Sequence, residues 1–190
     1  MLRVIVDVVI PALDEERALP GVLDELRGLG ARRVIVADNG SRDRTREVAR
    51  AGGAVVVEEP HRGYGAACLR ALAECRRDPP DAVAFLDADG SDDPAELPRL
   101  LLPLERGEAD LVLGSRVLPG GRLEPGALSP QARAGNLVAT TMIRVLYGVR
   151  FTDLGPFRAV GWSALESLDM RDRDWGWTGG LCPQLCSGEK

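Results

Sequence analysis

Histidine, cysteine and aromatic residues are scarce in this chain of 190 residues, which has one histidine, four cysteines and 4% aromatic residues. Cys68 and Cys75 fall on one face of an expected helix and should be buried small hydrophobic residues. Cys182 and Cys186 have no second cysteine pair or histidine nearby in the sequence, which disfavours a zinc site. The cysteines therefore indicate no disulfide framework, and a reducing compartment is the simplest expectation.

Excess positive charge and long apolar runs are also missing. The net charge of −5 and the pI near 5.0 argue against a broad nucleic-acid-binding face. No apolar run approaches the roughly 18–20 residues that span a bilayer. Residues Met1–Val6 run straight into a strand-like pattern, without a cleavable signal peptide. We therefore expect a cytoplasmic protein of one domain, and a peripheral position at a membrane surface stays open.

Two hydrophobic periods alternate along the first part of the chain. Apolar runs predict strands at 4–10, 33–37, 54–58, 82–86 and 110–114. Helical spacing predicts helices at about 19–29, 42–51 and 64–76, and a fourth that begins at Pro94, with Asp92 and Asp93 as caps. This alternation with short loops predicts an α/β domain with a mostly parallel sheet. The ligand site of such a sheet lies at the carboxyl ends of its strands.

The remaining residues have weaker patterns. Residues 118–130 are rich in glycine and proline and predict a loop beside the site. Residues 132–146 predict a moderately apolar helix. We assign no regular element to 148–178, and residues 179–190 show neither the strand nor the helix period.

The segment Asp87-Ala88-Asp89 directly follows the fourth predicted strand. Residues i and i+2 of an extended chain point the same way, so both carboxylates can face one site. Two carboxylates beside substrate phosphates suit a hard divalent cation. The alternative is a turn cap, because Asp-x-Asp triplets are common by chance. The other strand ends are rich in Gly, Asp, Arg or Pro and favour the site, since they should meet the triplet at one edge of the sheet.

The first strand ends in an acidic turn rather than a glycine-rich one. No Gly-x-Gly-x-x-Gly is present, which disfavours a dinucleotide-binding turn. Asp14, Glu15 and Glu16 have two interpretations, and both can hold. They offer polar groups to a base or ribose, or Asp14 caps the next helix while the glutamates complement its dipole.

The second strand ends at Asp38. Asn39-Gly40 predicts a tight turn, and Ser41 or Asp43 can cap the following helix. Asp38 is then a carboxylate at a strand end without a local partner. It could accept hydrogen bonds from the edge of a nucleobase.

Six motifs occur in a family-like order. They are Pro11-Ala12-Leu13-Asp14-Glu15-Glu16, Asp38-Asn39-Gly40-Ser41-x-Asp43-x-Thr45, Arg62-Gly63-Tyr64-Gly65-Ala66-Ala67, Leu86-Asp87-Ala88-Asp89-Gly90, Gly114-Ser115-Arg116 and Asp153-Leu154-Gly155-Pro156-Phe157-Arg158-Ala159. Over about residues 4–178 the chain resembles family 2 of the glycosyltransferases, near the dolichyl-phosphate mannosyltransferase-like branch. The resemblance implies the GT-A fold, with three α/β/α layers around a mostly parallel sheet. It divides the GT-A domain, 1–178, into a nucleotide-binding half at about 1–116 and an acceptor half at about 117–178, followed by a divergent tail at 179–190.

The resemblance also implies roles for individual residues. Those placed against the nucleotide, with Asp38 on the base, are Pro11, Ala12, Leu13, Glu15, Asp38, Arg62, Gly65, Asp87 and Ala88. Asp87 and Asp89 match a pair that binds Mg²⁺ or Mn²⁺, with Asp89 as the direct ligand. Arg116 and Arg158 match basic residues near the diphosphate or the acceptor's phosphate. Asp14 departs from the asparagine that relatives often have.

The implied activity is sugar transfer from a UDP or GDP sugar to an acceptor, with inversion at the anomeric carbon. A cation on Asp87 and Asp89 would neutralise the departing phosphate oxygen, and arginines would reinforce that effect. An alcohol acceptor would need a general base. A lipid phosphate such as a polyprenyl phosphate would need none, because it is already an anion at neutral pH.

The family pattern breaks near the end of the chain. Relatives lead from Gly-Trp-Thr into a helix with a Glu-x-Gln pattern, a final strand and a basic segment. Here Thr178 leads into Gly179-Gly180-Leu181-Cys182-Pro183, which cannot continue a helix. We therefore expect the chain to be shorter than its relatives and its acceptor half to be incomplete. An apolar patch left without these elements would favour a homodimer.

Two alternative functions follow from these departures. A nucleotide-sugar-binding protein with little or no turnover would lack the acceptor elements. A sugar-phosphate nucleotidyltransferase is disfavoured because the first strand has no glycine-rich phosphate loop.

Trp175 and Trp177 are either core residues or sugar platforms, and His61 is a loop residue that can touch a ligand. Asp153 either orients Arg158 or faces the site.

Overall fold

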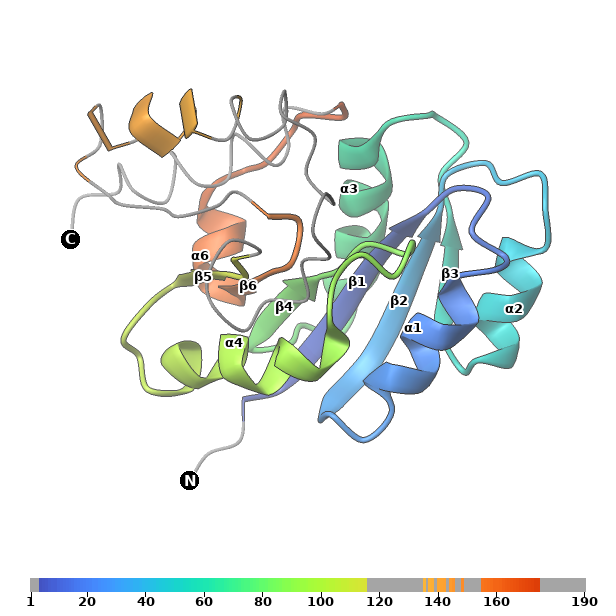
Figure 1. The fold of residues 1–190 in the computed structure, drawn as a ribbon, viewed down its shortest axis with the longest axis horizontal. Helices are drawn as coiled ribbons and strands as arrows, with labels where there is room; N and C mark the ends of the chain where they lie inside the picture. The colour runs from blue at the N-terminus through green and yellow to red at the C-terminus, as the bar shows by residue number, and fades with distance from the viewer. Residues whose placement is uncertain are drawn as a thin grey trace.

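The computed structural model describes residues 4–115, 135, 137–138, 140–142, 144–145, 148 and 155–174. Its strands are β1 (Val6–Ala12), β2 (Ala31–Asp38), β3 (Val55–Glu58), β4 (Ala82–Phe85), β5 (Leu111–Leu113) and β6 (Arg158–Gly161) (Figure 1). Its helices are α1 (Leu19–Leu26), α2 (Thr45–Ala51), α3 (Tyr64–Cys75), the 3₁₀-helix η1 (Pro94–Glu96), α4 (Leu97–Glu105) and α6 (Trp162–Ser167). Within these ranges, no helix is long and apolar enough to cross a membrane.

The strands form one sheet in the order β3-β2-β1-β4-β6-β5. The pairs β1–β2, β1–β4 and β2–β3 are parallel. Strand β6 is antiparallel to both of its neighbours, with Arg158 opposite Phe85 on one side and Leu113 on the other. The carboxyl ends of the parallel strands therefore meet at one edge, and the chain enters β6 at that same edge.

Helices cover both faces of the sheet because its strands alternate between two cores (Figure 1). Val8, Ile10 and Ala12 of β1 point into one core, which α1, α2 and α4 complete. Val9 points the other way, into the core that α3 and α6 complete. This side-chain period of two on a sheet buried on both faces produces three α/β/α layers.

The expected α/β fold with a mostly parallel sheet is confirmed. The described positions between 135 and 145 are helical, as expected for 132–146. The absence of an assignment over 148–178 was wrong, because β6 and α6 lie there. Both are short, and β6 begins with a charged residue, so neither has a clear hydrophobic period. The loop 118–130 and the tail 179–190 lie outside the described residues.

The end of the sheet opposite the strand carboxyl ends contains a fully buried acid, Asp7. Arg32 and Arg33 both donate to Asp7 Oδ2, at 2.8 and 2.6 Å. Arg32 also donates to Asp78 Oδ2 at 2.8 Å. Burial by itself would raise the pKa of Asp7, but the hydrogen bonds and charges of the two arginines outweigh it and lower the pKa. This charge cluster is remote from the strand ends where the motifs gather.

Candidate functional site

The Asp-x-Asp segment lies in a turn rather than in extended chain. Strand β4 ends at Phe85, and Ala88 and Asp89 are in the turn that follows. The extended geometry expected to align the two carboxylates is therefore wrong. Asp89 is exposed, and its Oδ1 accepts a hydrogen bond from Ser91 N at 2.9 Å. Asp87 is half-buried. Ala88 is buried in the core beside α1 and α4, so its side chain is turned away from solvent.

Two neighbours hold Asp87. The Tyr64 hydroxyl donates to Asp87 Oδ1 at 3.3 Å. Asp87 N donates to Asp92 Oδ2 at 3.3 Å. Asp92 therefore orders the Asp87 turn and is not the helix cap, while Asp93 accepts from Ala95 N at 3.1 Å as an N-cap should.

Glu15 adds a third carboxylate to this region. Burial raises its pKa, and the negative charge of Asp89 raises it further, ahead of the smaller effects of Asp43, Asp87 and Asp14. Glu15 is thus close enough to the turn after β4 to be repelled by it. The site has a concentrated negative charge, which disfavours ionisation of Glu15.

The loops after β1 and β2 are joined by reciprocal hydrogen bonds. Asp14 N donates to Ser41 Oγ at 3.0 Å, and Arg42 N donates to Asp14 Oδ1 at 2.7 Å. Glu15 N donates to Thr45 Oγ1 at 2.8 Å. Because these bonds face the second loop, the expected capping role of Asp14 is wrong: α1 begins at Leu19 and has no side-chain cap.

Asp14 adopts a left-handed backbone conformation, with φ 59°. Asparagine and aspartate enter this region more readily than other non-glycine residues. The asparagine that the family resemblance implies at this position would therefore fit the same conformation. In the second loop, Asp43 Oδ1 accepts from Thr45 N at 2.9 Å, one residue ahead of the N-cap Arg44, which has no side-chain capping bond.

Asp38 has local partners, contrary to expectation. It is 1% exposed, and Arg46 Nη1 donates to Asp38 Oδ2 at 2.9 Å. Ser41 N also donates to Asp38 Oδ1, at 3.4 Å. The carboxylate is therefore already ordered by α2 and the second loop, and contact with a base stays a prediction.

Asn39 connects the second loop to the third. It is buried, its Nδ2 donates to Glu59 O and His61 O at 3.1 and 2.7 Å, and its Oδ1 accepts from Gly63 N at 2.8 Å. The sequence motif suggested only a tight turn at this residue. The one feature of the sequence that could have indicated this connection between loops is the side-chain amide at a strand end, which can both donate and accept hydrogen bonds. Arg62 is exposed within the loop that Asn39 holds.

Arg158 lies within the protein rather than at an open strand end. It is 0% exposed, its Nε donates to Pro156 O at 3.1 Å, and its guanidinium carbon is 5.9 Å from the centre of the Phe85 ring. Burial raises the pKa of Tyr64, and Arg158 partly opposes that rise by its charge and a side-chain hydrogen bond. Arg158 therefore supports the layer beneath Tyr64 in this structure.

Two glycines allow a distant segment to approach the start of α3. A Cβ on Gly63 would lie 2.2 Å from Arg173 O, and one on Gly65 would lie 2.3 Å from Asp172 O. Gly65 N donates to Asp174 O at 3.2 Å, and Ala66 N donates to Arg173 O at 2.8 Å. We call residues 172–174 the strap. Gly65 has a packing role here, and its predicted contact with a nucleotide is untested.

The other predicted nucleotide contacts lie at the same end of the sheet. Pro11 and Ala12 end β1, where Ala12 is buried and Ala12 O accepts from Asn39 N at 2.9 Å. Leu13 is 37% exposed. Arg116, Asp153, Trp175, Trp177, Cys182 and Cys186 lie outside the described residues.

Asp87 and Asp89 suit a hard cation, which takes carboxylate oxygens and can complete its coordination with phosphate oxygens and water. Burial and, after it, the neighbouring carboxylates Asp89, Asp43, Asp87 and Asp14 raise the pKa of Glu15 beside this pair. Within the described part of the chain, no three His, Cys, Asp or Glu residues are grouped to hold a metal alone. The donor set therefore fits a cation shared with a diphosphate.

Comparison with known proteins identifies the family. The model of the family "Glycosyl transferase family 2" matches residues 7–168. An uncharacterized glycosyltransferase of Mycobacterium tuberculosis is 39% identical over 172 residues, which cover 90% of this chain and 74% of the relative. An undecaprenyl-phosphate mannosyltransferase of Micrococcus luteus is 33% identical, with 85% and 68% covered. The chain belongs to glycosyl transferase family 2, as its motifs predicted.

Solved structures agree with this assignment. Glucosyl-3-phosphoglycerate synthase of Mycobacterium tuberculosis, crystallised with Mn²⁺, UDP-glucose and phosphoglyceric acid, superposes with a TM-score of 0.74 at 30% identity. The match covers 94% of this chain and 64% of the synthase chain. The same synthase was also crystallised with Mg²⁺ and UDP. The predicted GT-A fold is confirmed, and the chain spans a little under two thirds of the length of these synthase chains.

Proposed function

We propose that this chain transfers a sugar from a nucleoside-diphosphate sugar, with a divalent cation held by Asp87, Asp89 and the diphosphate. The observation that carries the proposal is the pair of carboxylates after β4, with Asp89 exposed and Asp87 held by Tyr64 and Asp92. A hard divalent cation takes such oxygens as ligands. The charges of Asp89 and Asp87 also contribute, after burial, to the raised pKa of Glu15. The Mn²⁺ and UDP-glucose in the related synthase support the same pairing of metal and donor.

The three loops at the strand ends would receive the nucleotide. The first two form one bonded unit through Asp14, Ser41 and Arg42, and Asn39 attaches the third. Their shape is fixed before a ligand arrives, which lowers the entropic cost of binding. Asp89, exposed in its turn, is the proposed direct ligand, and Asp87 is the ligand held by its neighbours.

The proposed reaction is an inverting displacement at the anomeric carbon. The acceptor oxygen forms the new glycosidic bond as the bond to the diphosphate breaks, and the nucleoside diphosphate departs. A bound Mg²⁺ or Mn²⁺ supplies neutralisation of the charge on that leaving group. We propose a polyprenyl phosphate as acceptor, which needs no general base. The undecaprenyl-phosphate mannosyltransferase among the relatives supports this choice.

Titration calorimetry tests donor binding. UDP, GDP and their sugars would be titrated with Mn²⁺, with Mg²⁺ and in EDTA. We expect binding that requires the metal, and loss of the metal-dependent part in Asp89→Ala with the fold retained. Asp24→Ala is the matched control, since Asp24 is an exposed aspartate of α1 that pairs with Arg27 just after the helix. Unchanged metal-dependent affinity in Asp89→Ala would refute the metal assignment.

A transfer assay separates the alternative functions. The bound donor, labelled in its sugar, would be incubated with a polyprenyl phosphate and with water alone. Labelled lipid supports the proposal. Donor binding without transfer or hydrolysis supports a nucleotide-sugar-binding protein. Pyrophosphate release from a nucleoside triphosphate and a sugar phosphate supports a nucleotidyltransferase.

A further inference from the structure

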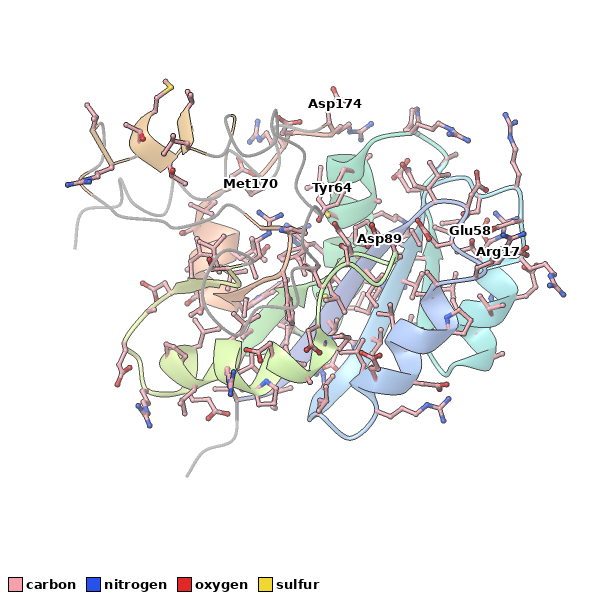
Figure 2. The ribbon with its side chains drawn as sticks, viewed as in Figure 1. Arg17, Glu58, Tyr64, Asp89, Met170 and Asp174 are labelled. Carbon is pink, nitrogen blue, oxygen red and sulfur yellow. The ribbon has the colours of Figure 1, made fainter. Side chains whose placement is uncertain are left out.

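The first turn of α3 lies between two parts of the protein that are far apart in the sequence. On one side the strap, residues 172–174, accepts hydrogen bonds from Gly65 N and Ala66 N. On the other, the Tyr64 hydroxyl donates to Asp87 Oδ1 at 3.3 Å. Figure 2 shows Tyr64 between Asp174 and Asp89 in this view. A single helical turn therefore contacts both the strap and the turn after β4.

The contact with the strap is made by backbone and is close. Gly63 adopts φ 153°, and a Cβ there would lie 2.2 Å from Arg173 O. A Cβ on Gly65 would lie 2.3 Å from Asp172 O and 2.9 Å from Arg173 C. Backbone atoms cannot rotate away as a side-chain end can, so only glycine permits this approach. The two glycines flank Tyr64 and fix its backbone against the strap.

The contact with Asp87 is made from a well-packed position. Tyr64 is partly buried and packs against the core that includes Cys68 and Phe85. Arg158, 0% exposed, also interacts with the Tyr64 hydroxyl, and its guanidinium carbon lies 5.9 Å from the centre of the Phe85 ring. The ring has little room to turn, so the position of α3 decides where its hydroxyl points. That hydroxyl contacts the half-buried member of the carboxylate pair.

We propose that Tyr64 is a positioning residue that couples the strap to Asp87. With the strap docked, the first turn of α3 is fixed and Tyr64 holds the Asp87 carboxylate in the orientation that shares a cation with the donor. With the strap displaced, that orientation is lost. The inference rests on the proposed function, because it concerns the same cation and nucleotide. It assigns to a segment late in the chain an influence on donor binding.

Two substitutions break the coupling at different places. Tyr64→Phe removes the hydroxyl and keeps the ring. Gly65→Ala places a methyl group against the backbone of Asp172 and so displaces the strap. Gly21→Ala is the matched control, because Gly21 is also a helical glycine but has nothing within 4 Å of the added Cβ.

The readouts are nucleotide affinity in Mn²⁺ and in EDTA, and trypsin cleavage at Arg171 and Arg173. The nucleotide is UDP or GDP, whichever the unmodified chain binds. We expect Tyr64→Phe to weaken the Mn²⁺-dependent affinity about 3- to 10-fold, as the loss of one hydrogen bond should, and to leave cleavage unchanged. Gly65→Ala should weaken the same affinity and accelerate cleavage. Because the two act in series, the double variant should lose no more than the larger single loss.

Each of the other outcomes would overturn one part of the inference or of the proposed function. Unaltered Mn²⁺-dependent affinity in Tyr64→Phe, with normal binding by the unmodified chain, overturns the inference and leaves the proposed function intact. Faster cleavage of Gly65→Ala with full affinity overturns the coupling, as do additive losses in the double variant. Absence of metal-dependent binding in the unmodified chain overturns both the proposed function and the inference. Tyr64→Phe keeps the test valid if Gly65→Ala does not fold.

Discussion

The side-chain amide of Asn39 donates to the backbone carbonyl of His61 at 2.7 Å. Together with its bonds to Glu59 O and Gly63 N, this contact attaches the loop after β3 to the end of β2. Loops are usually the least stable parts of a fold. Here a buried side chain supplies the hydrogen bonds that a strand would otherwise give.

We expect Asn39→Ala to destabilise the protein by about 1–3 kcal/mol, because three backbone groups in part-buried hydrogen bonds lose their partner. Limited proteolysis should then cleave at Arg62, and urea denaturation should give the free energy. Asn39→Asp keeps only the acceptor and brings a carboxylate near two carbonyls, so it should be at least as damaging. Cleavage at Arg27, in an exposed turn after α1, serves as the internal control. Equal cleavage at Arg62 before and after substitution would contradict the role of Asn39.

Asp7→Asn should cost about 3–5 kcal/mol at pH 7, since it leaves two arginines beside a buried uncharged group. Asp78→Asn is the matched control. It pairs with the same Arg32, but its side chain is 67% exposed, so we expect a loss of less than about 1 kcal/mol. Chemical denaturation of both variants measures the difference. Similar losses of stability in the two variants would show that the burial of Asp7 does not determine how much its substitution destabilises the protein.

The pH dependence of Asp7 follows from its lowered pKa. A pKa that is lower in the folded than in the unfolded chain gives stability above the unfolded value and loses it as the pH falls through the folded value. With an ordinary value of 3.8, the advantage of the unmodified chain over Asp7→Asn should persist to that pH and shrink below it. A difference that already disappears near neutral pH would contradict this assignment.

Glu15→Gln should have opposite effects on the metal-free and metal-bound protein. The pKa of Glu15 is raised above its ordinary value of 4.5 by burial and by Asp89. Its stabilising contribution is therefore present below that value and lost as the pH rises through the folded value. At pH 7 in EDTA we expect the variant to be more stable by up to about 0.5 kcal/mol. With Mn²⁺ and nucleotide, the unmodified chain should gain more, and thermal unfolding under both conditions shows whether the order reverses.

Cys68 and Cys75 should resist alkylation in the folded protein. Both are buried, and burial raises the pKa of each thiol, that of Cys75 to about 12. Few thiolates then exist at pH 8, and reagents cannot reach them. Peptide mapping after iodoacetamide treatment should find both positions unlabelled in buffer and labelled in urea. Rapid labelling in buffer would contradict their burial.

The sequence predicted an α/β domain with a mostly parallel sheet because each early strand and helix has its own hydrophobic period, and the family resemblance implied its three layers. It predicted the family because six motifs keep their order. Strand β6 was missed because it has only four residues and begins with the charged Arg158, so it shows no clear hydrophobic pattern. Local patterns also assigned Asp14 and Asp92 to helix caps. In the structure, Asp14 accepts a hydrogen bond from Arg42 N, and Asp92 accepts one from Asp87 N. The capping rule considers only the next helix and so could not predict these contacts.

The contacts that the sequence did not indicate run between loops. The contacts of Asn39 with the third loop join residues 20 to 24 positions apart, and Gly65 meets a segment more than a hundred residues away. No period or spacing reports such contacts. The metal-binding role of Asp87 and Asp89 stays a prediction, drawn from carboxylate chemistry, the i and i+2 spacing and the family motif. The backbone of this pair was wrongly expected to be extended.

The position of β6 affects how the chain can fold as it is made. Among the described strands, β6, at residues 158–161, lies between β4 and β5. While the ribosome has delivered only the first 113 residues, β4 has β1 on one side and an open edge on the other. Such an edge can pair with other chains. Because β6 comes late in the chain, we expect this edge of β4 to stay open to other chains until residue 161 has been made.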